Sequence, residues 1–353
     1  MRDKLRKLYC NQASSSARIV WLDVVRGILI LSVVIGHNIQ FGSGKAIQND
    51  FLFFEDPVFR FIYSFHMPCF MLLSGFFQRF GIDKHSFWKY RIQTILVPAI
   101  VWSTLPEVYS LLRSVVNRNF SVTLFISSVK IIPTHFWFLW AGFFCSIIVW
   151  LGHHYFQDSP VLFIVIGIVL LFIPDWLNTE LWKFMYPYFV TGYYLNRKKI
   201  DFVWAKERKW GVLIVLIIGY LVLLTFYTTE SYVYTTGIFV KDIRQLCIDI
   251  YRYLIGFVGS FMIIWAVYIF YPLLDDKIHW INTILAYCGR ISLSIYIIDG
   301  IINGMILPKI TNDFNLDYGI VFAEMIIILI ICACGDWLIK RVPIARRLLL
   351  GSR

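Results

Sequence analysis

The sequence predicts an all-α protein that crosses a membrane many times, and its composition is the first reason. Of its 353 residues, 59% are hydrophobic and 16% are charged, whereas soluble domains carry about 25% charged residues. With a mean hydropathy of +0.68, the chain has too few charges to cover a water-exposed surface. This composition excludes a large soluble catalytic domain, a nucleic-acid-binding protein and a secreted disulfide scaffold.

Ten apolar stretches are the second reason, because a helical span needs about 20 residues. Charged or turn-forming residues bound each stretch, and only the short segment PDWLNT separates the fifth from the sixth. The expected spans are residues 19–41, 58–80, 92–113, 135–152, 160–177, 180–196, 210–228, 250–272, 283–305 and 317–340. We therefore expect a polytopic bundle of about ten transmembrane helices in a lipid bilayer.

The distribution of positive charge predicts that both termini are cytoplasmic. With the N-terminus inside, Lys and Arg total 21 in the inner segments and nine at the outer side, and cytoplasmic segments carry this excess in membrane proteins. The net charge of +11 then reflects topology rather than a nucleic-acid partner. We expect residues 1–18 to be a basic cytoplasmic segment, 19–340 the transmembrane domain and 341–353 a basic cytoplasmic tail.

The first span carries an informative group of polar residues. A charge inside a bilayer costs about 3 kcal/mol and is a functional candidate. Arg26 and His37 are 11 residues apart, which places them on one helix face about 16 Å apart along the axis. Asp23 lies one turn before Arg26 and can pair with it. An alternative stays open, in which Asp23 and Arg26 only neutralise each other and His37 caps the helix.

Other spans add polar residues at similar depths. In the second span, FRFIYSFHMPCFMLLSGFF, His66 lies near the outer side, Pro68 should kink the helix, and Ser74 and the glycine after it offer a small packing surface. The fourth span opens with THFWFLW, which places His135 beside Trp137. The residues expected in the outer half are His37, His66, His135, Asp299, Glu107 and Glu324. Imidazoles with nearby carboxylates suit general-base catalysis.

The inner half is expected to carry cations. Arg26 and Arg290 fall there, and the inner segments 79–91 and 197–209 are basic. Arginines are suited to a phosphorylated ligand, so these segments, with Lys89 and Arg91 in the first, are candidate anion sites. Topology signals and lipid headgroup contacts are the alternative explanation of the same charges.

No motif indicates a metal or redox centre. The seven cysteines include no CxxC pair, and no HExxH, G-x-S-x-G or glycine-rich phosphate loop occurs. We therefore expect no metal.

Five segments, taken in chain order, resemble the membrane-bound acyltransferase-3 family. Arg26 and His37 in RIVWLDVVRGILILSVVIGH match its first-helix hallmark, an Arg followed by ten residues and a His. FHMPCFMLLSGFF, HFWFLWAGFF, YPYFVTGYYL and GRISLSIYIID are similar to its later motifs, so the resemblance covers about residues 18–299. The last motif commonly ends in His where this chain has Asp299, so no catalytic role is carried over to that position.

The resemblance implies an O-acyltransferase of the bacterial cytoplasmic (inner) membrane, similar to stand-alone sugar O-acetyltransferases. It implies acetyl-CoA as the donor and a hydroxyl of a cell-surface polysaccharide or lipid-linked sugar as the acceptor. We expect His37 to be the general base, Arg26 to position the donor and Asp23 to hold Arg26. The residues expected to bind the acceptor are His66, Ser74, His135, Trp137 and Asp299. For His66 and His135 the alternative role is to supply oxyanion donors. Those expected to bind the donor's coenzyme are Arg26, Arg290, Lys89 and Arg91.

Two alternatives remain open at this point. A transporter for a small anion or a glycolipid would use the same intramembrane arginines and histidines, although the internal repeats of many transporters are not evident. An acyltransferase could also use another donor, such as succinyl-CoA.

Overall fold

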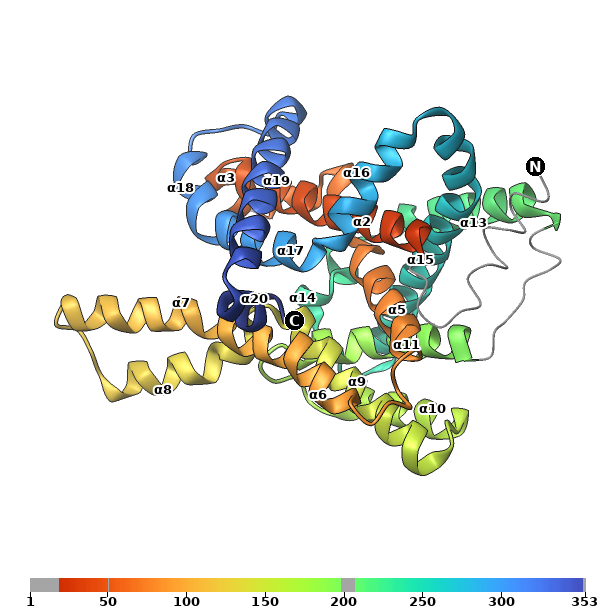
Figure 1. Cartoon of the computed structure of the whole chain (residues 1–353), viewed down its shortest axis with the longest axis horizontal. Helices are drawn as coiled ribbons and strands as arrows, with labels where there is room; N and C mark the ends of the chain where they lie inside the picture. Colours follow the sequence, from red (N-terminus) through yellow and green to blue (C-terminus); the bar gives the residue numbers. More distant parts are fainter. Residues whose placement is uncertain (1–18, 50, 198–206, 352–353) are drawn as a thin grey trace.

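A computed structural model of the chain describes residues 19–49, 51–197 and 207–351, and Figure 1 shows them as packed helices. These ranges contain no strand. The predicted segment 1–18 lies outside the described residues. Six of the described helical segments are long and apolar enough to cross a membrane: Val20–Gly42, Phe87–Val116, Trp137–Phe156, Ile243–Leu274, Ser292–Ile310 and Tyr318–Arg341. The predicted all-α fold is confirmed for the described residues, and six of their helical segments are candidate membrane spans. The count of ten spans and the cytoplasmic termini stay predictions.

Each of the ten predicted spans has a helical counterpart. The α-helices are α2 (Val20–His37), α3 (Lys45–Asn49), α4 (Pro57–Tyr63), α5 (His66–Gln78), α6 (Phe87–Arg91), α7 (Val97–Val116), α8 (Val122–Ile131), α9 (Trp137–Phe156), α10 (Pro160–Phe172), α11 (Thr179–Arg197), α13 (Lys209–Thr225), α14 (Val233–Thr236), α15 (Ile243–Lys277), α16 (His279–Arg290), α17 (Ser292–Ile301), α18 (Leu307–Ile310), α19 (Tyr318–Arg341) and α20 (Pro343–Leu350). The π-helical segments are η1 (Asn38–Gly42), η3 (Ile92–Leu96) and η6 (Ile302–Ile306), and the 3₁₀ turns are η2 (Leu52–Phe54), η4 (Ile132–Thr134) and η5 (Thr229–Ser231).

The second predicted span is two helices, with the break where its proline requires one. Pro68 has no N–H for the carbonyl of Ser64, four residues earlier, and its ring crowds that carbonyl. Accordingly, α4 ends at Tyr63 and α5 begins at His66. The break places His66 in the first turn of α5, at the end of the helix rather than within it.

The ninth predicted span, residues 283–305, is also interrupted, contrary to the expectation of one helix. Helix α16 ends at Arg290, and α17 begins at Ser292. Up to that point α16 follows α2 so closely that a Cβ at Gly289 would lie 1.9 Å from the carbonyl oxygen of Asp23. After the interruption α17 begins as a separate helix, and it meets α2 near the other end, where Asp299 pairs with His37.

In the described part of the chain, two helices of eight or more residues lie outside the ten predicted spans. Helix α8 forms an antiparallel hairpin with α7 that projects from the rest of the molecule (Figure 1). It begins at an N-cap, Ser121, whose hydroxyl oxygen accepts a hydrogen bond from the Leu124 amide at 3.1 Å. Within the predicted tail 341–353, Pro343–Leu350 form α20, which packs on α7 through a 2.8 Å hydrogen bond from the Trp102 indole to the carbonyl of Leu349.

Two hydrophobic cores meet at α5. Its Phe70 and Leu73 belong to a core formed with α2, α17 and α19, and its Met71 and Leu72 belong to a second core formed with α9 and α11. Glycine allows the closest helix contacts, as it does in many membrane bundles. A Cβ at Gly192 of α11 would lie 1.9 Å from the Leu72 carbonyl oxygen of α5.

This contact predicts that Gly192→Ala lowers stability. The added methyl group would collide with a backbone oxygen that cannot rotate away, and overpacking of this kind costs about 1–3 kcal/mol. The control is Gly219→Ala on α13, where nothing lies within 4 Å of the new Cβ, so it should be neutral or slightly stabilising. Thermal unfolding of the purified variants in detergent measures both, and equal melting temperatures for the two would contradict the close approach.

Candidate active site

A cavity of about 390 Å³ lies between the two cores, within the size range of small-molecule sites. Val33 and Ile255 line it from the first core, and Leu181 and Met185 line it from the second. Four of the residues predicted to act in the site also line it, and they are His37, His66, His135 and Trp137. Three histidines that are far apart in the sequence therefore face one cavity.

His37 and Asp299 form a hydrogen-bonded pair at the cavity wall. The Nδ1 atom of His37 lies 2.7 Å from Oδ2 of Asp299, which is fully buried. The other carboxylate oxygen, Oδ1, accepts a 2.7 Å hydrogen bond from the Asn303 side chain. Because a carboxylate can only accept, Nδ1 of His37 carries the proton and Nε2 carries the free lone pair. Asp299 thus lies behind His37, and the structure does not place it among the residues that line the cavity.

Irregular backbone surrounds this pair. The π-helical segment η1 begins directly after His37, and η6 begins three residues after Asp299 and carries Asn303. Such π-helical segments are frequent at functional sites. The irregular backbone therefore lies directly beside both members of the pair, and in η6 it supplies Asn303 as a partner of Asp299.

The other two histidines also have defined tautomers. Nδ1 of His66 lies 2.8 Å from the carbonyl oxygen of Ile62, and this bond leaves Nε2 as the acceptor in the neutral ring. For His135, Nε2 lies 2.8 Å from Oε1 of Glu107, so Nδ1 is the acceptor when the ring is neutral. Both histidines are therefore better suited to accepting a hydrogen bond from a hydroxyl than to donating one to an oxyanion.

Aromatic side chains make up much of the remaining wall. Tyr63 packs edge-to-face on His66 with ring centroids 4.7 Å apart, and Tyr232 lies 5.9 Å from Tyr63. Burial raises the pKa of the Tyr232 hydroxyl well above its ordinary value, so this hydroxyl stays protonated at neutral pH and can donate a hydrogen bond. Flat apolar faces with a few polar groups are typical of small-ligand sites.

Other predicted site residues lie away from the cavity. The Ser74 hydroxyl donates to the Phe70 carbonyl of its own helix at 2.9 Å. Arg26 lies at the end of α2 remote from His37, with its guanidinium 4.2 Å from the centre of the Phe77 ring and 3.9 Å from Asp23. The expected pairing of Asp23 with Arg26 is therefore present, at the long end of the ion-pair range.

The three other predicted donor-binding cations also lie outside the cavity lining. Arg290 ends α16 beside the first turns of α2, is exposed and lies over Tyr287 at 5.7 Å. Lys89 and Arg91 lie on α6, which follows α5 through residues 79–86. Lys89 is exposed, whereas Arg91 is half-buried with its guanidinium over Phe87 at 5.6 Å.

Sequence reasoning missed Arg252, which also lines the cavity. It is 1% exposed and lies within the predicted eighth span, in IYRYLIG. The rule that singled out Arg26, a charge inside an apolar stretch, would have found it. Arg252 lies only two residues inside that span, so it is one of the nine outer-side cations counted for topology.

Comparisons with known proteins identify the family of this chain. Residues 19–339 match the family described as an acyltransferase domain. The chain is similar to nodulation protein NolL of Mesorhizobium japonicum, with 28% identity over 239 residues, which are 65% of this chain and 62% of the relative. It is also similar to nodulation protein NolL of Sinorhizobium fredii, with 30% identity over 185 residues, which are 51% and 50%. The matches thus span less than two thirds of these curated relatives, and no solved structure matches.

The family match extends across nearly all of the helical chain, and it includes both His37 at the cavity and Arg26, about three turns earlier on the same helix. The chain therefore belongs to the membrane-bound acyltransferase-3 family.

Proposed function

We propose that this protein transfers an acetyl group from acetyl-CoA to a hydroxyl of a cell-surface saccharide or lipid-linked sugar, in a bacterial cytoplasmic membrane. The observation that carries the proposal is the His37–Asp299 pair, whose imidazole lines the cavity of an acyltransferase. A histidine that is oriented by a carboxylate and keeps a free Nε2 is the usual general base for activating a hydroxyl.

The reaction that this geometry favours has two steps. Nε2 of His37 takes the proton of the acceptor hydroxyl while the oxygen attacks the thioester carbonyl, and a tetrahedral intermediate forms. The carbon–sulfur bond then breaks, and the imidazolium returns its proton to the leaving thiolate, which yields the ester and free CoA thiol. Asp299 keeps the imidazole in the required tautomer and stabilises the imidazolium between the two steps.

The cavity walls suit a sugar as the acceptor. Lone pairs on His66 and His135 can accept hydrogen bonds from sugar hydroxyls, and Trp137 and Tyr232 can pack against the apolar face of a sugar ring. Ring stacking and hydroxyl hydrogen bonds together would orient one hydroxyl toward His37. The acceptor is thus assigned by chemical class, as a saccharide or a glycolipid.

We assign the donor's phosphates to the other end of α2. Arg26 lies about 16 Å from His37 along the helix axis, so a long flexible acyl arm is needed to bring a thioester to the histidine. The pantetheine arm of CoA is such a group. The guanidinium of Arg26 packs on Phe77, and the Arg26 side chain as a whole is 28% exposed, so a phosphate could approach it from outside the bundle.

One prediction of this proposal concerns His37 as the general base. His37→Ala should reduce acetyl transfer by about 10²–10⁴-fold, the usual contribution of a general base, and Asp299→Asn should reduce kcat because it favours the wrong tautomer. Thiol release from acetyl-CoA by the purified protein in lipid vesicles, supplied with glycan extracts, measures both effects. The matched control is His154→Ala, which removes an exposed histidine stacked on Trp150. Full activity of His37→Ala would end this mechanism.

Another prediction concerns the binding of acetyl-CoA by Arg26. Arg26→Lys keeps the charge but loses the planar fork that binds phosphate oxygens in pairs, so the KM for acetyl-CoA should rise roughly tenfold. The control is Arg113→Lys at the exposed end of α7. A donor KM that does not change would show that Arg26 acts only in packing, and competition with succinyl-CoA in the same assay identifies the preferred acyl group.

A further inference from the structure

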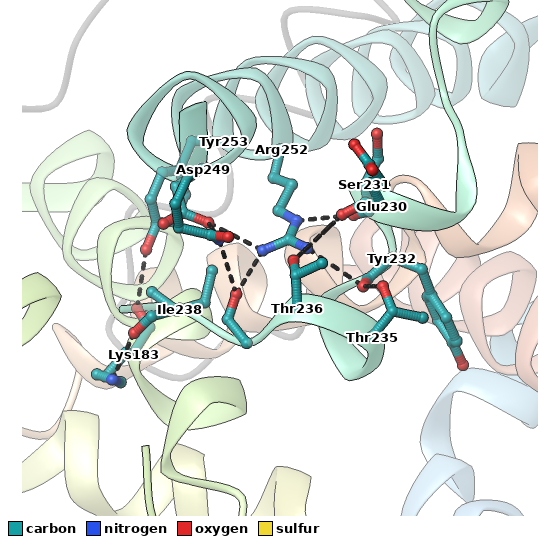
Figure 2. Close-up of polar contacts among 12 residues, drawn as sticks. Lys183, Glu230, Ser231, Tyr232, Thr235, Thr236, Ile238, Asp249, Arg252 and Tyr253 are labelled. Carbon is teal, nitrogen blue, oxygen red and sulfur yellow. Dashed lines mark hydrogen bonds and ion pairs between the residues drawn. The ribbon is translucent and has the colours of Figure 1, made fainter. Parts of the chain in front are cut away.

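Arg252 is enclosed by the chain segment that precedes its own helix. Figure 2 shows its guanidinium, which projects from α15, surrounded by residues 230–237. The side chain is 1% exposed, and its ion-pair partner Asp249, one turn earlier on α15, is equally buried. A buried arginine with one buried carboxylate requires further hydrogen-bond acceptors, because an unsatisfied buried charge is costly.

Segment 230–237 supplies those acceptors almost alone. The guanidinium donates to four backbone carbonyls and one hydroxyl of this segment, and to Asp249. The partners are Ser231 O at 2.9 Å, Gly237 O at 2.5 Å, Glu230 O at 2.6 Å, Tyr232 O at 3.2 Å, the Thr236 hydroxyl, and Asp249 Oδ1 at 2.9 Å. Nε and both terminal nitrogens of the guanidinium all donate to these partners. Arg252 therefore lines the cavity but is not left free to bind a ligand itself.

The other side of this segment forms part of the cavity wall. The cavity is lined by four consecutive residues of the segment, Ser231, Tyr232, Val233 and Tyr234. Regular structure here is limited to the short elements η5 and α14, so other contacts must hold the segment in place. Its backbone carbonyls turn inward to the guanidinium, and its tyrosines turn to the cavity. Arg252 is therefore well placed to hold this part of the wall in one conformation.

A second buried cation holds Ile238, the residue that directly follows the segment. The ammonium group of Lys183, 3% exposed, donates to the Ile238 carbonyl at 2.5 Å and to the Ile173 carbonyl at 2.7 Å, and it pairs with Asp175. Asp175 in turn accepts a 2.9 Å hydrogen bond from the Ile238 amide. Lys183 thus ties Ile238 to the loop between α10 and α11. Arg252 contacts residues 230–237, the part that lies at the cavity.

From the wall, contacts continue to the predicted acceptor site. The ring of Tyr232 lies 5.9 Å from that of Tyr63, and Tyr63 packs on His66 at 4.7 Å. Tyr234 lies 4.9 Å from Tyr232 and is also a lining residue. These groups lie at the His37 end of α2, whereas the proposed donor cation Arg26 lies at the opposite end.

We propose that Arg252 is a positioning residue for the acceptor: it fixes residues 230–237 so that Tyr232 and Tyr234 form the surface on which a saccharide ring binds beside His66. This inference rests on the proposed acyl transfer to a sugar. It assigns acceptor recognition to a segment that carries no family motif, and it distinguishes this segment from the donor site on α2.

The test is Arg252→Lys, which keeps the charge at this buried position but offers three donors from a single point instead of a fork. Acetyl-CoA is the donor, and hexyl glucoside, a water-soluble alkyl sugar, is the acceptor probe. The KM for hexyl glucoside should rise at least tenfold, while the KM for acetyl-CoA stays within twofold. Hydrogen exchange of the backbone amides of residues 231–237 should accelerate at least tenfold in the same variant, because the carbonyls lose their fixed partner.

The matched control is Arg244→Lys, on the same helix and beside the same segment. Arg244 is 73% exposed and pairs at the surface with the Glu230 side chain at 2.5 Å. Both kinetic constants and amide exchange should stay at wild-type values in this control.

Three outcomes overturn the inference: unchanged amide exchange in Arg252→Lys, faster exchange with an unchanged acceptor KM, or a rise in both KM values together. The melting temperature of the variant shows whether it folds, and Asp249→Asn, which removes only the carboxylate partner, gives a milder second test in the same direction. If the wild-type protein releases no thiol from acetyl-CoA, the proposed function fails instead, and amide exchange still decides whether Arg252 fixes the segment.

Discussion

The architecture around the cavity depends on one constraint, which is that ionisable groups removed from water must each find a partner within the protein. His37 is paired with Asp299, His135 with Glu107, and Arg252 with Asp249 and a set of carbonyls. Each partner comes from its own helix, a neighbouring helix or a loop, so these pairs also fix how the elements are arranged. The polar groups that suit catalysis are thus also the groups that hold the site together.

Interruptions in the helices make these pairs possible. A straight second span would bury His66 within the helix, whereas the break caused by Pro68 places it in the first turn of α5, with its Nδ1 bonded to the Ile62 carbonyl. The interruption before Ser292 separates α17, which carries Asp299, from α16, which is held tightly against α2. Glycine thus lets α16 pack closely on α2, and the interruption that follows lets α17 carry Asp299 to His37.

The sequence predicted what depends on local pattern. Helical periodicity placed Arg26 and His37 on one face of the first helix. The similar depth expected for His37, His66 and His135 in the bilayer predicted that they would lie together, and all three line the cavity. The sequence pattern could not predict that His37 pairs with Asp299, 262 residues away, because that contact depends on the interruption of the ninth span. Ser74 was predicted to bind the acceptor, but its hydroxyl donates within its own helix. This local hydrogen bond is not visible from the pattern of polar residues.

The carboxylate at position 299 now has a physical explanation. A histidine there, as the family's motif commonly has, could bond to His37 only as a neutral partner or with repulsion between two protonated rings. A buried carboxylate instead accepts from Nδ1 of His37 and attracts the imidazolium that forms when Nε2 takes a proton. Asn303 donates to the second carboxylate oxygen, which holds the Asp299 side chain in this orientation. The departure from the motif is therefore compatible with the proposed general-base role of His37, because the carboxylate lies beside the ring that would become positively charged in that proposal.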